Sequence, residues 1–326
     1  VAIAGTATIY LTSRIALRIF HERKWALLAA ILMTLDGLNL VMSRTALLDI
    51  FLTLFVLLAV NAWLKGKYLG LAIYFGLAMG SKWSAIYYVA IFLILDLYIN
   101  RKLFRTIKVG ITSLLVYLIS WFGWFNSSLG WDRNVKSNPF LSLLYYHKEM
   151  LNFHTSLTEK HTYQANPWSW LVMGRPTSFY YQSPKGCGVK DCAKEVLAIG
   201  TPILWWIGAI AVLLLIGVNL HNLAMREFEG AAVIPMLGII AGYLPWFFFQ
   251  KRTVFTFYAI VFEPFLILAL VLMAKMAYEY DERFKYLIGI TVFIIAVNFM
   301  DFYPLFTGMT ITYKEWYSHM WWSSWI

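Results

Sequence analysis

The residues with the clearest chemical potential are a few cations next to long apolar runs. Arg44, Lys82 and the pair Lys251 and Arg252 each precede a segment apolar enough to cross a membrane. A helix N-terminus already carries partial positive charge and free N–H groups, so a cation there favours an anion as partner. If these ends converge, Arg44, Lys82 and Arg252 form a phosphate-binding site. The alternative is that each cation reaches the membrane rim and contacts lipid headgroups.

Asp36, Asp49 and Glu263 fall inside apolar runs, where a charge is costly and usually has a partner or a task. Asp49 follows Arg44 at a spacing that is not that of an ideal helical pair, so we expect it to reach another cation or a substrate hydroxyl. Asp36 is a second candidate, for a substrate site or for an internal ion pair. For Glu263, beside Pro264, we expect structural pairing.

A long polar stretch supplies further candidates. The residues Tyr145–His154 alternate apolar and polar side chains in a pattern typical of a short amphipathic helix on a membrane surface. His147 and His154 can share its face, with Glu149 between them, which suits hydrogen bonding near a polar substrate. Two histidines and one glutamate are weak evidence for a metal, so we predict none.

The same stretch holds aromatic residues and a further cation. Trp168, in a turn-rich aromatic segment, and Arg175 are candidate substrate contacts. Tryptophan faces stack on sugar rings, and they also populate the aromatic belts at membrane interfaces. Both interpretations of Trp168 remain open at the level of sequence.

These side chains must be positioned by a membrane domain. The chain is 60% hydrophobic and 13% charged, far from a soluble average. A span needs roughly 20 apolar residues, and about ten such segments occur, six before the polar stretch and four after it. They are Val1–Phe20, Trp25–Met42, Ala46–Leu64, Tyr68–Gly80, Ser84–Ile99, Thr106–Phe125, Leu197–Asn219, Ala231–Phe249, Thr253–Ala274 and Phe284–Met300. The predicted fold is all-α and polytopic.

The connections between spans set the topology and account for the formal charge of +10 without nucleic acid. One set of connections is rich in Lys and Arg and is therefore placed in the cytoplasm, whereas the candidate phosphate cations lie on the opposite side. We predict four regions: 1–126 with six spans, 127–196 as an outward loop, 197–303 with four spans, and 304–326 as an outward tail.

The outward loop contains Cys187 and Cys192, which can form a disulfide in an oxidising compartment or remain two thiols.

No nucleotide-binding motif occurs, so an anionic donor would have to be lipid-linked. Several segments then give the chain a family resemblance over nearly its whole length. They are Met42–Asp49, Gly80–Ser84, Tyr146–His154, Tyr163–Trp170, Gly174–Pro176, Phe257–Tyr258, Phe262–Phe265 and Trp316–Ile326. With these segments the chain resembles the protein O-mannosyltransferases, membrane-embedded GT-C glycosyltransferases. The short loop around Cys187 and Cys192, followed by Gly200–Pro202, is similar to the bacterial, actinobacterial-type branch.

The resemblance implies transfer of mannose from polyprenyl-phosphate mannose to Ser or Thr of secreted proteins, with inversion at the anomeric carbon. It places Arg44, Lys82 and Arg252 at the donor phosphate and implies an enzyme of the cell membrane whose active site faces outward. Membrane lipid and secreted acceptor proteins are the expected partners, the secretion channel is a further candidate, and no cofactor is implied.

The chain departs from the family pattern in one respect. Family members have about eleven spans and carry an adjacent Asp-Glu pair, the general base, in the first outward loop. No such pair occurs in the corresponding region here. We therefore expect the first span and that loop to be missing from this sequence, the catalytic residue to be unidentified, and the segment as given to be inactive.

Two other functions are compatible with the spans. Another GT-C glycosyltransferase with a lipid-phosphate donor would share the phosphate site, although it should lack the aromatic segment around Trp168. A polytopic transporter would explain the intramembrane acids, but it should show repeated halves with broken helices. The arrangement of six spans, one outward loop and four spans argues against the transporter.

Overall fold

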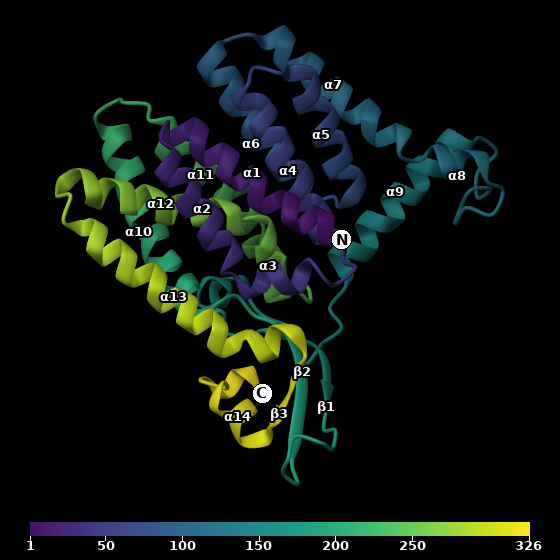
Figure 1. The fold of residues 1–326 in the computed structure, drawn as a ribbon. Helices are drawn as coiled ribbons and strands as arrows, with labels where there is room; N and C mark the ends of the chain where they lie inside the picture. Colours follow the sequence, from purple (N-terminus) through teal and green to yellow (C-terminus); the bar gives the residue numbers. More distant parts are fainter.

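The computed structural model describes all 326 residues as a helical bundle with a smaller outer layer (Figure 1). Every predicted apolar segment contains helix, which confirms the all-α polytopic prediction. The α-helices are α1 (Ala2–Phe20), α2 (Arg23–Thr34), α3 (Gly37–Met42), α4 (Leu48–Leu64), α5 (Tyr68–Ser81), α6 (Ala85–Asn100), α7 (Leu103–Ile119), α8 (Phe122–Asn126), α9 (Pro139–Ser156), α10 (Pro202–Ala224), α11 (Gly230–Tyr243), α12 (Glu263–Tyr280), α13 (Phe284–Thr307) and α14 (Tyr313–Ser318). By length and apolarity alone, α10, Gly230–Phe249 and α13 can each cross a membrane, and α4, α5 and α6 are shorter apolar helices.

Several helices begin later than the hydrophobic pattern predicts. Ser43, which precedes Arg44, ends α3 and donates its hydroxyl to Asn39 O, and α4 starts only at Leu48. The segment after Arg252 first forms a 3-10 helix, η3 (Thr256–Val261), and α12 starts at Glu263. Proline is well tolerated in the first turn of a helix, so Pro264 marks a start and not a mid-span break. Arg44 and Arg252 therefore do not stand directly at α-helix N-termini.

The bundle packs tightly where glycine allows helices to approach. A Cβ added at Gly76 of α5 would lie 2.6 Å from the backbone oxygen of Ser113 in α7, and one at Gly238 of α11 would lie 2.2 Å from the ring of Phe265 in α12. Small residues at such crossings let neighbouring backbones come close, which favours association of membrane helices. The close packing of α5 on α7 matters for function because both helices contribute to the cavity described below.

The outer layer contains a small sheet that the sequence pattern did not predict. β1 (Thr177–Gln182), β2 (Cys192–Ala198) and β3 (Thr310–Thr312) are antiparallel in the order β1-β2-β3, and a bulge interrupts the first pair at Phe179. Leu197, predicted to begin a span, lies in β2, because α10 starts only at Pro202. β3 follows α13, so the sheet joins the loop 127–196 to the tail 304–326, beside α14 (Figure 1).

Other loop features match their predictions. Cys187 and Cys192 form a disulfide at the turn between β1 and β2. The amphipathic helix predicted over Tyr145–His154 is part of α9, which Asn138 caps by accepting a hydrogen bond from Phe140 N. The loop also contains a 3-10 helix, η1 (Pro167–Val172), and a second one, η2 (Leu244–Phe249), follows α11. The last of these short helices, η4, spans Ser323–Trp325.

Candidate active site

One cavity brings together residues from both halves of the bundle and from the loop. Its volume is about 670 Å³, and it lies where the turn between α5 and α6 meets α7, α9 and η2. Its lining is mostly apolar and aromatic, with two cations, one histidine and several hydroxyl groups. The lining residues are Leu48, Met79, Gly80, Ser81, Lys82, Trp83, Ser84, Ile86, Tyr87, Tyr117, Ser120, Trp121, Met150, Leu151, His154, Thr155, Trp246, Phe249 and Arg252.

Lys82 is held at this cavity by a carboxylate from another helix. Its Nζ lies 2.7 Å from Oδ1 of Asp49, a buried residue in the first turn of α4. Asp49 thus reaches a cation other than Arg44, as its spacing in the sequence predicted. About a fifth of the Lys82 side chain remains exposed (21%), compared with 6% for Asp49. The lysine therefore presents a partly accessible ammonium group while its partner is enclosed.

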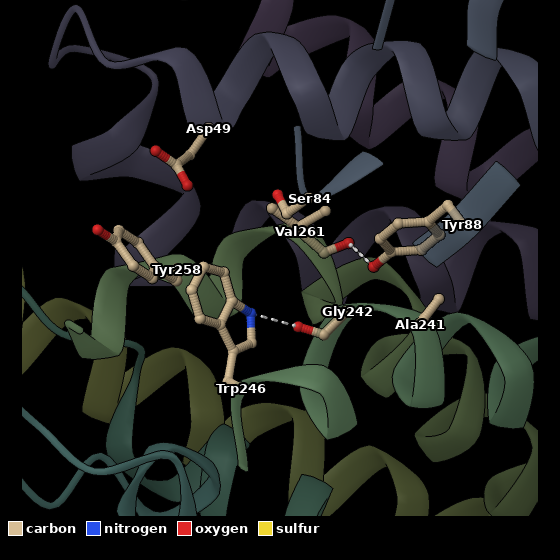
Figure 2. A pocket seen from close by; sticks show the side chains of 8 residues that line it. All are labelled: Asp49, Ser84, Tyr88, Ala241, Gly242, Trp246, Tyr258 and Val261. Carbon is tan, nitrogen blue, oxygen red and sulfur yellow. Dashed lines mark hydrogen bonds between the residues drawn. The ribbon is translucent and has the colours of Figure 1, made fainter. Parts of the chain in front are cut away.

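Aromatic rings surround Lys82 on its other sides. Its Nζ lies 3.7 Å from the ring centroid of Tyr258 and 5.9 Å from that of Trp246, within the range of cation–π attraction. Figure 2 shows Asp49, Tyr258 and Trp246 around a small adjoining pocket. Its volume of about 10 Å³ is close to that of a single water site. The Trp246 indole donates to Gly242 O at 3.1 Å, which fixes the ring orientation.

Arg252 lines the same cavity and contacts His154 of α9. Its Nη2 lies 3.3 Å from Nδ1 of His154, and its guanidinium carbon lies 6.0 Å from the Trp246 ring centroid. Burial, then the positive charges of Arg252 and Lys82, lower the pKa of His154 below its ordinary value. His154 is therefore neutral at pH 7, and its Nδ1 can accept the arginine N–H.

His147 lies behind the cavity lining, in a series of hydrogen bonds with the lining residues Trp83 and Tyr117. Trp83 Nε1 donates to Tyr117 OH at 3.0 Å, and that hydroxyl lies 2.5 Å from His147 Nε2. His147 Nδ1 lies 2.8 Å from Leu143 O, so Nδ1 carries the proton and Nε2 accepts from the tyrosine. His147 also stacks on Trp83, with ring centroids 5.4 Å apart. This series of hydrogen bonds joins the α5–α6 turn, α7 and α9.

The other predicted site residues lie outside the cavity lining. Arg44 is exposed and donates to Phe306 O at 3.4 Å, so the structure brings together Lys82 and Arg252 but not all three predicted cations. Asp36 is fully buried, where Thr201 N donates to it at 2.7 Å and Trp205 Nε1 at 3.0 Å. Its carboxyl also lies near the buried Glu263, but the two carboxylate oxygens of Glu263 have no hydrogen-bond partner and no cation, so the structural pairing expected for that residue is not found.

The remaining loop candidates have different surroundings. Trp168 is 66% exposed, and Glu149 is half-buried on α9. Arg175 donates to Thr162 O at 2.9 Å and to Ile326 O at 2.6 Å, so it connects the loop to the tail. The structure thus gives Arg175 a clear contact role away from the cavity.

The aromatic residues of the site were not among the sequence-based candidates, and they include Trp83, Tyr117, Trp246 and Tyr258. Trp83 and Trp246 stand close in sequence to Lys82 and Arg252, and this adjacency was a usable signal. Tyr117 had no such signal, because it lies on a predicted lipid-spanning segment and its role depends on α9 folding back over α7.

Two family models match the chain. Residues 1–127 match dolichyl-phosphate-mannose-protein mannosyltransferase, and residues 139–325 match the C-terminal four-transmembrane region of protein-O-mannosyltransferase. Neither description is that of a transporter, nor of a glycosyltransferase acting on another acceptor.

Curated relatives and a solved structure agree with these matches. The chain is 29% identical to a polyprenol-phosphate-mannose–protein mannosyltransferase of Mycolicibacterium smegmatis and 28% identical to one of Corynebacterium glutamicum, over 99% and 100% of its length and 76% of theirs. Its fold is similar to a chain of the S. cerevisiae protein O-mannosyltransferase Pmt1–Pmt2 complex bound to the sugar donor. That similarity has a TM-score of 0.80 at 14% identity, covering 99% of this chain and 80% of that one.

Proposed function

Since the chain belongs to the protein O-mannosyltransferase family, we propose that it transfers mannose from polyprenyl-phosphate mannose to Ser or Thr hydroxyls of secreted proteins, with inversion. The observation that supports this most directly is the presence of Lys82 and Arg252 in one aromatic cavity. We propose no cofactor besides the lipid-linked donor.

The charges around the cavity suit a phosphodiester donor. Lys82 and Arg252 contribute two positive charges, Asp49 neutralises one of them, and His154 is neutral. The remaining positive charge stabilises the negative charge that develops on the phosphate as its bond to the sugar breaks. In that step the acceptor oxygen bonds to the anomeric carbon, the polyprenyl phosphate leaves, and the hydroxyl proton passes to a base.

The general base is not assigned to any described residue. The resemblance implies an adjacent Asp-Glu pair, which this sequence lacks in the expected place. Asp49 is enclosed and bound to Lys82, an arrangement that suits holding the cation more than accepting a proton. We therefore assign Asp49 to positioning.

The apolar part of the lining suits the lipid. Leu48, Ile86, Tyr87 and Phe249 line the cavity together with the cations, so an isoprenoid chain can contact them while its phosphate reaches Lys82 and Arg252. The chain is a multi-pass membrane protein, and we propose that it resides in the cell membrane with this cavity on the outer side. Secreted polypeptides, and the channel that exports them, would then be its partners.

The direct test is a transfer assay with the full-length protein, as its gene encodes it, in proteoliposomes. Radiolabelled polyprenyl-phosphate mannose and a Ser/Thr peptide should give a mannosylated peptide with inverted anomeric configuration. The matched controls are the same peptide with Ala and Val at the hydroxyl positions, and polyprenyl-phosphate glucose as donor. Transfer to a lipid acceptor and not to the peptide would contradict the proposal.

His154 predicts a pH dependence of donor binding. Its pKa is lowered in the free protein, and a bound phosphate, being negative, would offset the nearby cations and raise it again. The complex then binds more protons than the free protein, so affinity rises as pH falls and levels off below the pKa of the free protein. We expect binding of polyprenyl-phosphate mannose, a phosphodiester whose own charge stays constant over this range, to strengthen several-fold between about pH 7.5 and 5.5.

The measurement is a binding titration of that lipid at several pH values. His154→Gln keeps a polar side chain that does not titrate, and it should make the affinity independent of pH over this range. A His154→Gln variant with the same pH profile as the wild type would refute the assignment.

A further inference from the structure

Two aromatic rings lie against the cavity cations: Tyr258 is close to Lys82, and Trp246 is near both Lys82 and Arg252. Lys82 Nζ lies 3.7 Å from the Tyr258 centroid, and Trp246 lies between the two cations, 5.9 Å from Lys82 Nζ and 6.0 Å from the Arg252 guanidinium carbon. A carboxylate such as Asp49 holds a cation by cancelling its charge. An aromatic face attracts a cation through its quadrupole and leaves the net charge unchanged.

Trp170 of the outer loop is packed behind these two rings. It is fully buried, with ring centroids 5.8 Å from Trp246 and 6.1 Å from Tyr258. Its indole donates to Ala165 O at 3.0 Å, and Ala165 N donates to Val254 O at 2.8 Å, so the loop is fixed to the segment that precedes η3. Trp246 and Tyr258 are themselves in contact, at 4.9 Å.

We propose that Trp170, Tyr258 and Trp246 form an aromatic support that holds Lys82 and Arg252 at the spacing needed to bind the donor phosphate. This inference rests on the proposed function and assigns positioning residues to it. The outward loop is then part of the phosphate site, through a tryptophan that never contacts the lipid. Trp168, two residues away and exposed, does not belong to the support.

The arrangement also explains why Lys82 remains available to an anion. Its ammonium group has one carboxylate partner and two aromatic neighbours, and a fifth of its side chain stays exposed toward the cavity. Replacing a ring by an aliphatic side chain of similar bulk would keep the apolar packing and remove the attraction to the cation. The ammonium group could then follow Asp49 away from Arg252.

The test measures binding of polyprenyl phosphate and of polyprenol to the full-length protein in nanodiscs. The ratio of the two affinities reports on the phosphate contact and is insensitive to a general loss of stability. We expect Tyr258→Leu and Trp170→Leu each to reduce this ratio about tenfold, and Tyr258→Phe, which keeps the ring face, to change it less than about twofold.

Trp206→Leu is the matched control. Trp206 is a partly buried tryptophan in the same outer region, where its indole donates to Val172 O at 3.0 Å and its ring stacks on Trp322, with no cation among its contacts. Equal reductions in the ratio for Trp206→Leu and Tyr258→Leu would overturn the aromatic support and leave the proposed function intact. A wild-type protein that binds both lipids equally would overturn the phosphate site itself, and the proposed function with it.

Discussion

Replacing Lys82 with methionine lowers the rate of mannose transfer about 100- to 1,000-fold, the largest functional effect expected for this chain. The lysine is one of two cations at the cavity, and the leaving phosphate gains charge as the glycosidic bond breaks. Methionine keeps the length and much of the volume of the side chain, so the loss reflects charge more than packing. The loss is measured from the initial rates of mannose transfer by the wild type and by Lys82→Met, with saturating peptide and varied concentrations of the lipid donor.

A second variant separates phosphate binding from neutralisation of Asp49. Lys82→Met alone leaves a buried carboxylate without its partner at 2.7 Å, which is costly by itself. The double variant Asp49→Asn/Lys82→Met removes that unpaired charge and should fold like the wild type while transfer stays low. Recovery to within about tenfold of the wild-type rate would mean that Lys82 serves only Asp49.

The charge control is Lys148→Met. Lys148 is exposed on α9, in the loop 127–196, and does not line the cavity. It removes the same formal charge from the same side of the protein, so it tests whether a general electrostatic attraction of the anionic lipid is enough. We expect it to change the transfer rate less than about twofold at physiological salt.

The largest effect on folding is expected at Asp36. Its carboxylate accepts hydrogen bonds from Thr201 N at 2.7 Å and from Trp205 Nε1 at 3.0 Å, at the start of α10, and it also caps α3 through Leu38 N. Asp36→Ala leaves these donors unpaired in a fully buried site, at a cost of about 3 kcal/mol in the free energy of unfolding. Asp36 thus joins the two halves of the bundle.

Thermal unfolding of the detergent-solubilised protein, followed by the monodisperse fraction remaining after heating, measures this loss. Asp36→Asn keeps one acceptor oxygen and should lose less stability than Asp36→Ala. Asp281→Ala is the control, because Asp281 forms its ion pair with Arg283 in an exposed turn, where such pairs contribute little. If Asp36→Ala melted within a degree or two of the wild type while transfer was abolished, the substrate role first considered for Asp36 would be correct.

Much of the architecture follows from the sequence because its signals are local. Apolar segments long enough to span a membrane, the excess of Lys and Arg in alternate connections, and the amphipathic pattern of α9 are each contained in a short window of residues. The pairing of Cys187 with Cys192 is equally local. These windows are sufficient for the fold class, and the ordered motifs are sufficient for the family; for the cysteines the sequence left a disulfide and two thiols open, and the structure has the disulfide.

The composition of the site depends on contacts between distant segments. Arg44, Lys82 and Arg252 look alike in sequence, yet only Lys82 and Arg252 share the cavity, because Arg44 lies in the turn between α3 and α4 and donates to Phe306 O of α13. Trp168 and Trp170 also look alike. One is exposed and the other lies fully buried behind Trp246 and Tyr258.

Sequence could not predict these contacts because hydropathy measures the free energy that a side chain gains by leaving water. It does not say which neighbour that side chain contacts in the fold. The sequence by itself determined that this chain is a multi-pass membrane protein of one family, and it predicted that the candidate cations lie on the side opposite the Lys- and Arg-rich connections. Only the tertiary structure decided which cations face one cavity, which rings support them, and that the sheet β1-β2-β3 joins the loop to the tail. Those outcomes depend on helix breaks and interhelical packing, which no short window of sequence contains.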